Sequence, residues 1–380
     1  MRNTPKIRFK GFSDDWEQRK FENIAIRSSS MSTESGLPRV EYEDIISETG
    51  RLNKDIFAKK SVKAGIVFHK DDVLYGKLRP YLKNWFLPSF KGLAVGDFWV
   101  LQPQNTDNSF LYRLIQTCKF DEVANQSTGT KMPRADWKLV SKTDFSVPYS
   151  IDEQSAIGTF FTDLDTFITL HQCKGDVLKK IKQALLQKLF PENGSLIPEL
   201  RFKGFTEPWE QRKLGDVVQF LDTQRQPLEE AKRIKGPYPY YGASGIVDYV
   251  NGYLFSEELI LLSEDGANIT DRNYPVCFLA KGKYWVNNHA HVLKADSGND
   301  NAFICNSLER KDFSEFNTGM AMPKLNKKVC HDIPVICPSY EEQREIGNFI
   351  LNLDNLITLH QRKCDSLKKL KQSLLQKMFV

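Results

Sequence analysis

The sequence predicts an α+β protein: two mixed α/β domains separated by two long helices, which pair as an antiparallel coiled coil with an internal pseudo-twofold repeat. Two repeated segments support this prediction. PKIRFKGFSDDWEQRK (5–20) returns as PELRFKGFTEPWEQRK (198–213), and IGTFFTDLDTFITLHQCKGDVLKKIKQALLQKLF (157–190) returns as IGNFILNLDNLITLHQRKCDSLKKLKQSLLQKMF (346–379). Such a long period indicates duplicated whole domains rather than a solenoid. We therefore expect a domain at 1–150, a helix at 151–191, a second domain at 192–338 and a second helix at 339–380.

The composition is that of a soluble globular protein, with 41% hydrophobic and 27% charged residues. No apolar run reaches the roughly 18 residues of a membrane span, and the first residues lack the apolar core of a signal peptide. The seven cysteines stand singly, without a CxxC pair. These features predict a cytoplasmic protein with reduced thiols.

The net charge of +5 is unevenly distributed along the chain. Residues 1–190 hold 29 Lys and Arg against 23 Asp and Glu, whereas residues 191–380 hold 24 against 25. Any nucleic-acid footprint must therefore be local, and tight binding of DNA would need a basic partner.

The repeated C-terminal segment of each half predicts the two long helices, at about 153–190 and 342–379. Proline and acidic residues precede each one, in VPYSIDEQ (147–154) and CPSYEEQ (337–343). Apolar residues then recur at steps of three and four, which is typical of a coiled-coil seam and includes Ile181 and Leu370. His171 and His360 fall on this seam and are expected to fix its register. Two ordinary core helices are the alternative.

The segments between the repeats, roughly 21–126 and 214–316, barely resemble each other. Short alternating runs bounded by Gly, Pro, Asn and Asp predict strands and turns. FLYRLIQTCKFDEVANQ (110–126) and NAFICNSLERKDFSEFN (301–317) have helical spacing. Both inserts end in a Thr-Gly turn followed by Met-Pro and basic residues, in STGTKMPRADWK (127–138) and NTGMAMPKLNKK (317–328).

Candidate DNA-contacting residues lie in these inserts and in the Met-Pro elements. Basic and amide side chains donate to phosphates or base edges, and aromatic rings pack on sugars and methyl groups. In the first half the candidates are Lys77, Arg79, Tyr81, Lys83, Asn84, Lys131 and Arg134. In the second half they are Asn268, Thr270, Arg272, Asn287, Asn288, His289, Lys324 and Lys327. A strand edge with snorkelling lysines is the alternative for YGKLRPYLKNW (75–85).

A search for catalytic motifs finds none in the sequence. It contains no GxxxxGK[ST] loop, GxSxG elbow or HExxH pair. His289 and His291 could ligate a metal if they lie on one strand, but no third ligand is evident and structural hydrogen bonding is favoured.

Taken together, RFKGF…WEQRK, YGKLRPYLKNW, SEDGANI, the TG…MP element and the EQ-initiated helix ending LLQK resemble the specificity subunit of type I restriction-modification systems, over the whole chain. The resemblance implies that each domain reads one half of a split DNA target. It also implies that the helices set the gap and dock two methyltransferase subunits, that two motor-nuclease subunits join for restriction, and that this chain catalyses nothing. S-adenosylmethionine, ATP and magnesium would then belong to the partner subunits.

The sequence therefore leaves two functions of different classes open. One is a DNA-reading subunit of such a complex. The other is a stand-alone metal-dependent nuclease that uses His289 and His291.

Overall fold

The computed structural model describes residues 4–59, 61–126, 132–192 and 194–380. The chain forms two compact units. Unit 1 comprises residues 1–172 with 362–380, and unit 2 comprises residues 173–361. The units divide the chain within the long helices rather than at the helix ends, because each half of a helix packs with a different unit.

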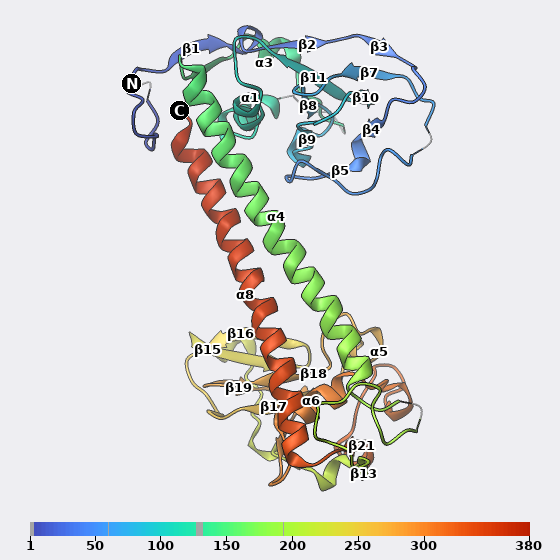
Figure 1. Ribbon diagram of the computed structural model, residues 1–380. Coiled ribbons are helices and arrows are strands. Elements are labelled where there is room, and N and C mark those ends of the chain that lie inside the picture. Colours follow the sequence, from blue (N-terminus) through green and yellow to red (C-terminus); the bar gives the residue numbers. More distant parts are fainter. Residues whose placement is uncertain (1–3, 60, 127–131, 193) are drawn as a thin grey trace. The chain divides into compact units, whose positions relative to one another are not determined.

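Unit 1 contains two four-stranded sheets and two strand pairs (Figure 1). One sheet has the order β2 (Ala25–Ser28), β11 (Phe98–Pro103), β8 (Val73–Gly76), β9 (Trp85–Phe86). The other has the order β3 (Met31–Ser32), β7 (Gly65–Phe68), β10 (Gly92–Val95), β4 (Arg39–Glu41). The pairs are β1 (Glu17–Lys20) with β12 (Asp144–Val147), and β5 (Ile45–Ile46) with β6 (Arg51–Leu52). The short helices are α1 (Asn108–Leu114), α2 (Cys118–Ala124) and α3 (Trp137–Lys142).

Unit 2 repeats the first of these sheets with different residues. Its four-stranded sheet has the order β14 (Val218–Phe220), β20 (Ala290–Ala295), β17 (Leu259–Ser263), β18 (Cys277–Ala280). A three-stranded sheet has the order β16 (Gly245–Val250), β15 (Lys235–Gly242), β19 (Trp285–Val286), and β13 (Glu210–Lys213) pairs with β21 (Pro334–Cys337). The helices are α5 (Asn268–Asp271), α6 (Asn301–Glu309) and α7 (Lys327–Asp332). The two inserts thus share one antiparallel sheet order that their sequences do not reveal.

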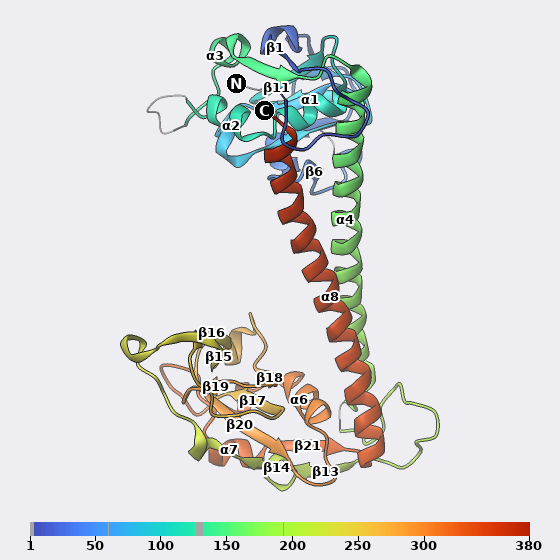
Figure 2. The same ribbon diagram turned by 90° about the vertical axis from the view of Figure 1, so that its left-hand side faces the viewer.

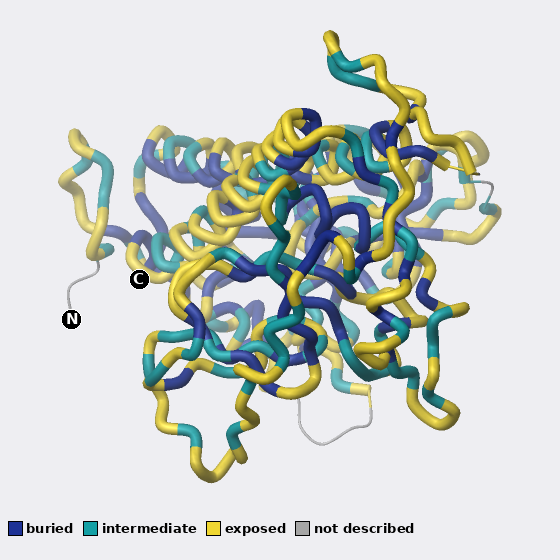
Figure 3. The backbone as a smooth tube through the Cα atoms, turned by 90° about the horizontal axis from the view of Figure 1, so that it is seen from below, coloured by how far each residue is buried: buried dark blue, intermediate teal, exposed yellow. Residues whose placement is uncertain are grey.

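The long helices are α4 (Ile151–Lys188) and α8 (Tyr340–Met378), and the predicted antiparallel pairing is confirmed within each unit. In unit 1 the N-terminal part of α4 packs with the C-terminal part of α8, where Lys371 Nζ lies 2.7 Å from Asp165. In unit 2 the partners exchange roles, and Lys182 Nζ lies 2.6 Å from Asp354. Figure 3 shows buried and exposed stretches alternating along the coils of these helices.

Each helix start is locked to the repeated RFKGF segment of its own half. Arg8 donates through Nε and Nη2 to Glu153 at 2.6 and 2.7 Å, and Arg201 donates to Glu342 at 2.7 and 2.8 Å. Both glutamates are 1% exposed. A bidentate guanidinium–carboxylate pair fixes orientation as well as distance. The acidic residue of each EQ pair therefore joins distant segments, in addition to favouring a first helical turn.

The glutamines of the EQ pairs make matching contacts. Gln154 accepts from Asp107 N–H at 2.9 Å and donates to the Pro148 carbonyl at 2.8 Å. Gln343 accepts from Asp300 N–H at 3.1 Å and donates to the Pro338 carbonyl at 3.0 Å. The same backbone geometry at both helix starts is thus held by the same side-chain pair.

The predicted seam is wrong at two positions. Ile181 is 44% exposed and Leu370 is 47% exposed. In unit 1 the first seam residues of α4, from Ile157 to Ile168, belong to the core that also holds Trp16 and Phe110 of the globular part. The apolar side of α4 therefore packs against the globular part as well as against the other long helix. A single heptad register does not describe it.

Candidate nucleic-acid interface

Three segments meet at one end of the central strands of unit 1: the turn after β8, the residue before β11, and the Met-Pro element. Three backbone hydrogen bonds join them. Lys77 N–H donates to the Asp97 carbonyl (2.9 Å), Ala135 N–H to the Lys77 carbonyl (2.8 Å), and Arg79 N–H to the Pro133 carbonyl (2.7 Å). We call Lys77–Asn84, Asp97 and Pro133–Ala135 the unit 1 junction.

Unit 2 contains the same three bonds between different residues. Glu264 N–H donates to the His289 carbonyl (2.9 Å), Leu325 N–H to the Glu264 carbonyl (2.7 Å), and Gly266 N–H to the Pro323 carbonyl (3.0 Å). We call Glu264–Arg272, Asn287–His289 and Pro323–Leu325 the unit 2 junction. The matched Met-Pro elements therefore dock onto matched turns, and most of the sequence-predicted residues gather at these two places.

Two cationic side chains of the unit 1 junction, Arg134 and Lys77, flank one carboxylate. Asp97 lies 3.2 Å from Arg134 Nη2 and 3.7 Å from Lys77 Nζ. The Arg134 side chain is 55% exposed. Arg79 and Lys83 adopt left-handed backbone conformations, with φ of 47° and 52°. Non-glycine residues in this region are strained and are often found at functional sites.

The other residues predicted in the first half have different surroundings. Tyr81 is 53% exposed, whereas Asn84 is 6% exposed and its Nδ2 donates to the Tyr42 carbonyl at 3.4 Å. Lys83 Nζ lies 3.3 Å from Glu48. The position of Asn84 suits support of the turn better than contact with DNA. Lys131 lies outside the described residues.

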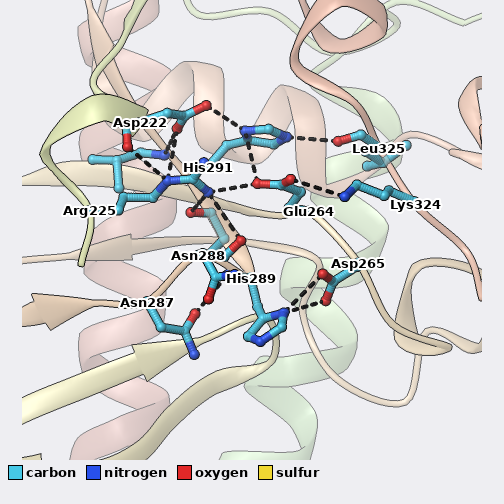
Figure 4. Close-up of polar contacts among 12 residues, drawn as sticks. Asp222, Arg225, Glu264, Asp265, Asn287, Asn288, His289, His291, Lys324 and Leu325 are labelled. Atoms are coloured by element: carbon cyan, nitrogen blue, oxygen red, sulfur yellow. Dashed lines mark hydrogen bonds and ion pairs between the residues drawn. The ribbon is translucent and has the colours of Figure 1, made fainter. Parts of the chain in front are cut away.

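The surface of the unit 2 junction presents His289 and Asn288, which are both exposed. His289 Nδ1 lies 2.9 Å from both carboxylate oxygens of Asp265 (Figure 4). Asn287 is 8% exposed, and its Oδ1 accepts from His289 N–H at 2.8 Å. Asn287 therefore shapes the turn that carries the two exposed side chains.

The basic residues of the second Met-Pro element differ in their partners. Lys324 Nζ lies 3.5 Å from Glu264 at the edge of the network in Figure 4. Lys327 is exposed, and its Nζ lies 5.4 Å from the ring centre of Phe220. Contact of either ammonium group with a phosphate stays a prediction.

Asn268, Thr270 and Arg272 are engaged in holding the turn around α5. Asn268 accepts from Tyr274 N–H at 2.8 Å and donates to the Tyr274 carbonyl at 2.9 Å. Thr270 Oγ1 donates to the backbone at 3.0 Å. Arg272 donates to the Glu309 carbonyl and lies 3.3 Å from the Glu309 carboxylate. These contacts favour a supporting role for all three residues.

A largely shielded ionic network lies beneath the unit 2 junction, and its members Asp222 and Arg225 are not among the residues predicted from the sequence. Arg225 Nη1 lies 2.7 Å from Glu264 and donates to the Ala290 carbonyl at 2.7 Å. His291 is 1% exposed and contacts Asp222 through Nδ1 at 2.7 Å (Figure 4). Asp222 and Arg225 are near each other in the sequence, but Arg225 is 39 residues from Glu264 and Asp222 is 69 residues from His291, so no local motif indicates the network.

His291 is held as an imidazolium by its two partners. Nδ1 faces the Asp222 carboxylate and Nε2 faces the Leu325 carbonyl, each at 2.7 Å. Both partners only accept hydrogen bonds, so both ring nitrogens must carry protons. Burial alone would lower the pKa of His291, but the hydrogen bond to Asp222 outweighs it and raises the pKa to about 10. Burial would likewise raise the pKa of Asp222, but the hydrogen bond to His291 lowers it.

This geometry also bears on the metal alternative. Both ring nitrogens of His291 are occupied, while the ring of His289 lies on the exposed turn. Within the ranges that the structure describes, no cluster of three or more His, Cys, Asp or Glu side chains is arranged to hold a metal ion. The structural reading of the His-x-His pair is the one these contacts support. In the same ranges no helix is long and apolar enough to cross a membrane.

Comparison with known proteins gives a consistent family. The model of the type I restriction modification DNA specificity domain matches residues 13–180 and again 206–369. The chain is 36% identical over 155 residues to S.HindORF215P of Haemophilus influenzae, which covers 41% of this chain and 39% of that protein. It is 26% identical over 185 residues to the type I restriction enzyme MjaVIII specificity subunit of Methanocaldococcus jannaschii, covering 46% and 42%. These alignments span about two fifths of the length of the relatives.

A solved structure extends the likeness to the whole chain. The S subunit of a type I restriction-modification system from M. genitalium superposes with a TM-score of 0.71 at 15% identity, covering 99% of both chains. At this identity the match shows the fold alone. Because the family model covers most of both halves, the chain belongs to the type I restriction modification DNA specificity domain family and carries two copies of that domain.

Proposed function

We propose that this chain is the non-catalytic specificity subunit of a type I restriction-modification enzyme, in which each unit reads one half of a split DNA target. The observation that carries the proposal is the pair of matched junctions. Two units share three backbone hydrogen bonds and a Met-Pro element, yet present different side chains. A common scaffold with different donors and acceptors is suited to reading two different base sequences.

The side chains of the two junctions support different base preferences. Unit 1 presents Arg134 beside Asp97, and unit 2 presents His289 beside Asp265. A guanidinium favours guanine O6 and N7, and a carboxylate accepts from the amino group of cytosine. The exposed residues Arg134, His289 and Asn288 are therefore the strongest base-reading candidates. Lys77, Lys324 and Lys327 are assigned to phosphate contacts instead.

The long helices are the proposed spacer and docking element for two methyltransferase subunits. Unit 1 exposes an apolar triplet of Phe167, Leu170 and Leu370, and unit 2 exposes the repeat-equivalent triplet of Leu356, Leu359 and Ile181. Each of these side chains is at least 44% exposed. Large apolar side chains that stay exposed on paired helices favour burial against another protein. Equivalent triplets in both units favour two copies of that partner.

Catalysis would then reside in the partners. The methyltransferase subunits would hold S-adenosylmethionine, and the motor-nuclease subunits would use ATP and magnesium in the cytoplasm. The competing function, a stand-alone nuclease, has no support from His291, whose ring is fully hydrogen bonded.

The test maps methylated adenines in DNA from cells with and without this gene. The proposal predicts that one bipartite motif loses methylation when the gene is removed. Unchanged methylation, together with DNA cleavage by the purified chain and a metal alone, would favour the nuclease instead.

A further inference from the structure

Each unit holds a cation over an aromatic ring at the edge of its main four-stranded sheet. In unit 1 the guanidinium carbon of Arg27 lies 5.1 Å from the ring centre of Trp137. In unit 2 the Nζ of Lys327 lies 5.4 Å from the ring centre of Phe220. Both distances fall within the roughly 6 Å over which a cation and an aromatic ring attract each other. Each unit therefore contains one such cation–ring pair.

The two pairs occupy equivalent positions, although the cation and the ring have changed places. The first repeat, continued at its offset of 193 residues, aligns Arg27 with Phe220, and the Met-Pro repeat aligns Trp137 with Lys327. Arg27 and Phe220 each pair with the fourth residue of the neighbouring strand, β11 or β20. Trp137 and Lys327 are the first residues of α3 and α7, and Figure 2 shows α7 beside β14. The cation thus lies on the strand in unit 1 and on the helix in unit 2.

The ring of each pair packs on the residue beneath the junction. Trp137 meets Trp99 edge-on at 5.1 Å, and Phe220 meets His291 edge-on at 5.9 Å. Trp99 and His291 are each the second residue of their strand, β11 or β20. In both units the same stack of three side chains therefore holds the cation close to the junction.

A positive charge at an exposed place is what the two pairs have in common. Arg27 and Lys327 are exposed, whereas the two rings are partly buried. Packing of a helix on a strand needs no charge, because two apolar side chains would also bury surface there. The position of the charge is therefore the shared feature that calls for a function.

DNA offers both units the same chemistry only in its backbone. Under the proposed function the half-sites differ in their bases, so base-reading side chains must differ, as Arg134 and His289 do. Phosphate contacts carry no sequence information and can be the same in both units. The methyltransferase subunits are a second shared partner, but their proposed docking triplets lie on the long helices rather than at the junctions. A cation kept beside both junctions thus fits a phosphate.

We propose that Arg27 and Lys327 contact the equivalent phosphate in the two half-sites, each held in place over its aromatic ring. The inference rests on the proposed function, because it needs both units to bind DNA. Arg27 was not among the residues predicted from the sequence. Since its repeat equivalent is Phe220, an alignment of the two halves does not reveal the shared charge.

The experiment uses the full chain in complex with its methyltransferase subunits and a duplex bearing the mapped target. Arg27→Gln and Lys327→Gln each remove one positive charge. Each should weaken binding about threefold to tenfold near physiological salt, by the same factor for the target and for duplexes with one base changed. Each should also lower the slope of log affinity against log salt concentration by about 0.9. The methylated motif should stay the same.

Exchanging the pair tests whether the position of the charge matters rather than the residue. Arg27→Phe combined with Trp137→Lys gives unit 1 the arrangement of unit 2, and should restore the salt slope that Arg27→Phe alone loses. Hydrogen exchange of unit 1 shows whether the double variant is folded. If it is not, Arg27→Lys provides the rescue, because it keeps the charge and leaves Trp137 in place. The matched control is Lys142→Gln, also on α3 but 2.8 Å from Glu22, which should leave affinity and slope unchanged.

An unchanged salt slope in either Gln variant would overturn the proposal. Relaxed recognition at one base position would also overturn it, because the cation would then read a base. Loss of methyltransferase subunits at unchanged DNA affinity would make the cation a protein contact instead. A wild-type complex without sequence-specific binding would refute the proposed function itself.

Discussion

Units 1 and 2 place different kinds of side chain beneath their junctions, aromatic in unit 1 and ionic in unit 2. The second residue of β11 is Trp99, paired with Tyr75, and the second residue of β20 is His291. Trp99 stacks on Tyr75 at 5.5 Å and meets Trp137 edge-on at 5.1 Å. His291 instead joins a buried ionic network. The same backbone hydrogen bonds are thus compatible with an aromatic or an ionic interior.

At the starts of the long helices, by contrast, the two units use the same residue types in the same contacts. Arg8 with Glu153 and Arg201 with Glu342 join segments that lie more than a hundred residues apart in the sequence. A bidentate pair of buried charges leaves little freedom for replacement, since any lone partner would be desolvated without compensation. The two halves therefore keep the same sequence where paired buried groups join the RFKGF segment to the helix start. They differ in sequence in the inserts, where no such pair constrains the residues.

The largest expected effect comes from breaking one of these locks. Arg8→Ala and Arg201→Ala should each lower the free energy of unfolding of their own unit by about 3–5 kcal/mol, because each leaves a buried glutamate unpaired. Hydrogen exchange in urea, read separately for the two units, measures this. The control is Lys142→Ala, whose exposed pair with Glu22 should contribute at most about 1 kcal/mol. A loss below that of the control in either unit would contradict the equivalence of the two locks.

The second effect distinguishes the units by pH. Because the folded-state pKa of His291 is about 10 and its ordinary value is 6.5, its contribution is fully present below about pH 6.5 and is lost as pH rises toward 10. Unit 2 should therefore lose on the order of 3–5 kcal/mol across this range, whereas unit 1 has Trp99 at the matching position.

Hydrogen exchange at pH 6.5, 8 and 9.5 measures this difference, and His291→Leu should flatten the pH dependence of unit 2. Parallel pH profiles for the two units of the wild-type chain would show that the network does not hold a charged imidazole.

A smaller effect concerns the apolar triplets. Leu170→Glu and Leu359→Glu each place a charge where we propose that a methyltransferase subunit buries a leucine. Each change should cost about 1.5–3 kcal/mol of binding and reduce the bound subunits from two to one at limiting concentration. Native mass spectrometry counts them, with the exposed helix residue Lys180 changed to Glu as the control. Retention of two subunits by both variants would exclude the triplets as docking sites.

The long helices could be predicted from the sequence because the segments that form and anchor them are repeated in both halves. Helices expected at about 153–190 and 342–379 are found at Ile151–Lys188 and Tyr340–Met378. The helical stretch expected at 110–126 is two short helices, because Thr117 stops the first and caps α2, accepting from Phe120 N–H at 3.3 Å.

The two junctions were harder to predict. Their segments are joined by backbone hydrogen bonds, which do not depend on residue type and so produce no sequence pattern. Asp97 and Asp265 were missed, although each stands beside a predicted candidate. Arg272 was chosen as a donor in a turn, but its partner Glu309 lies on α6 and could not be seen from the sequence. The Met-Pro elements were the one local signal shared by both junctions.

The central claim is that the two units read separate half-sites on one scaffold. Methylated-adenine mapping with Arg134→Ala in unit 1 and His289→Ala in unit 2 tests it most directly. Because each residue belongs to one junction, each variant should relax or weaken recognition in one half of the motif only, with a base-reading arginine costing about 1–3 kcal/mol. Degeneracy appearing in both halves from either single change would contradict separate reading by the two units.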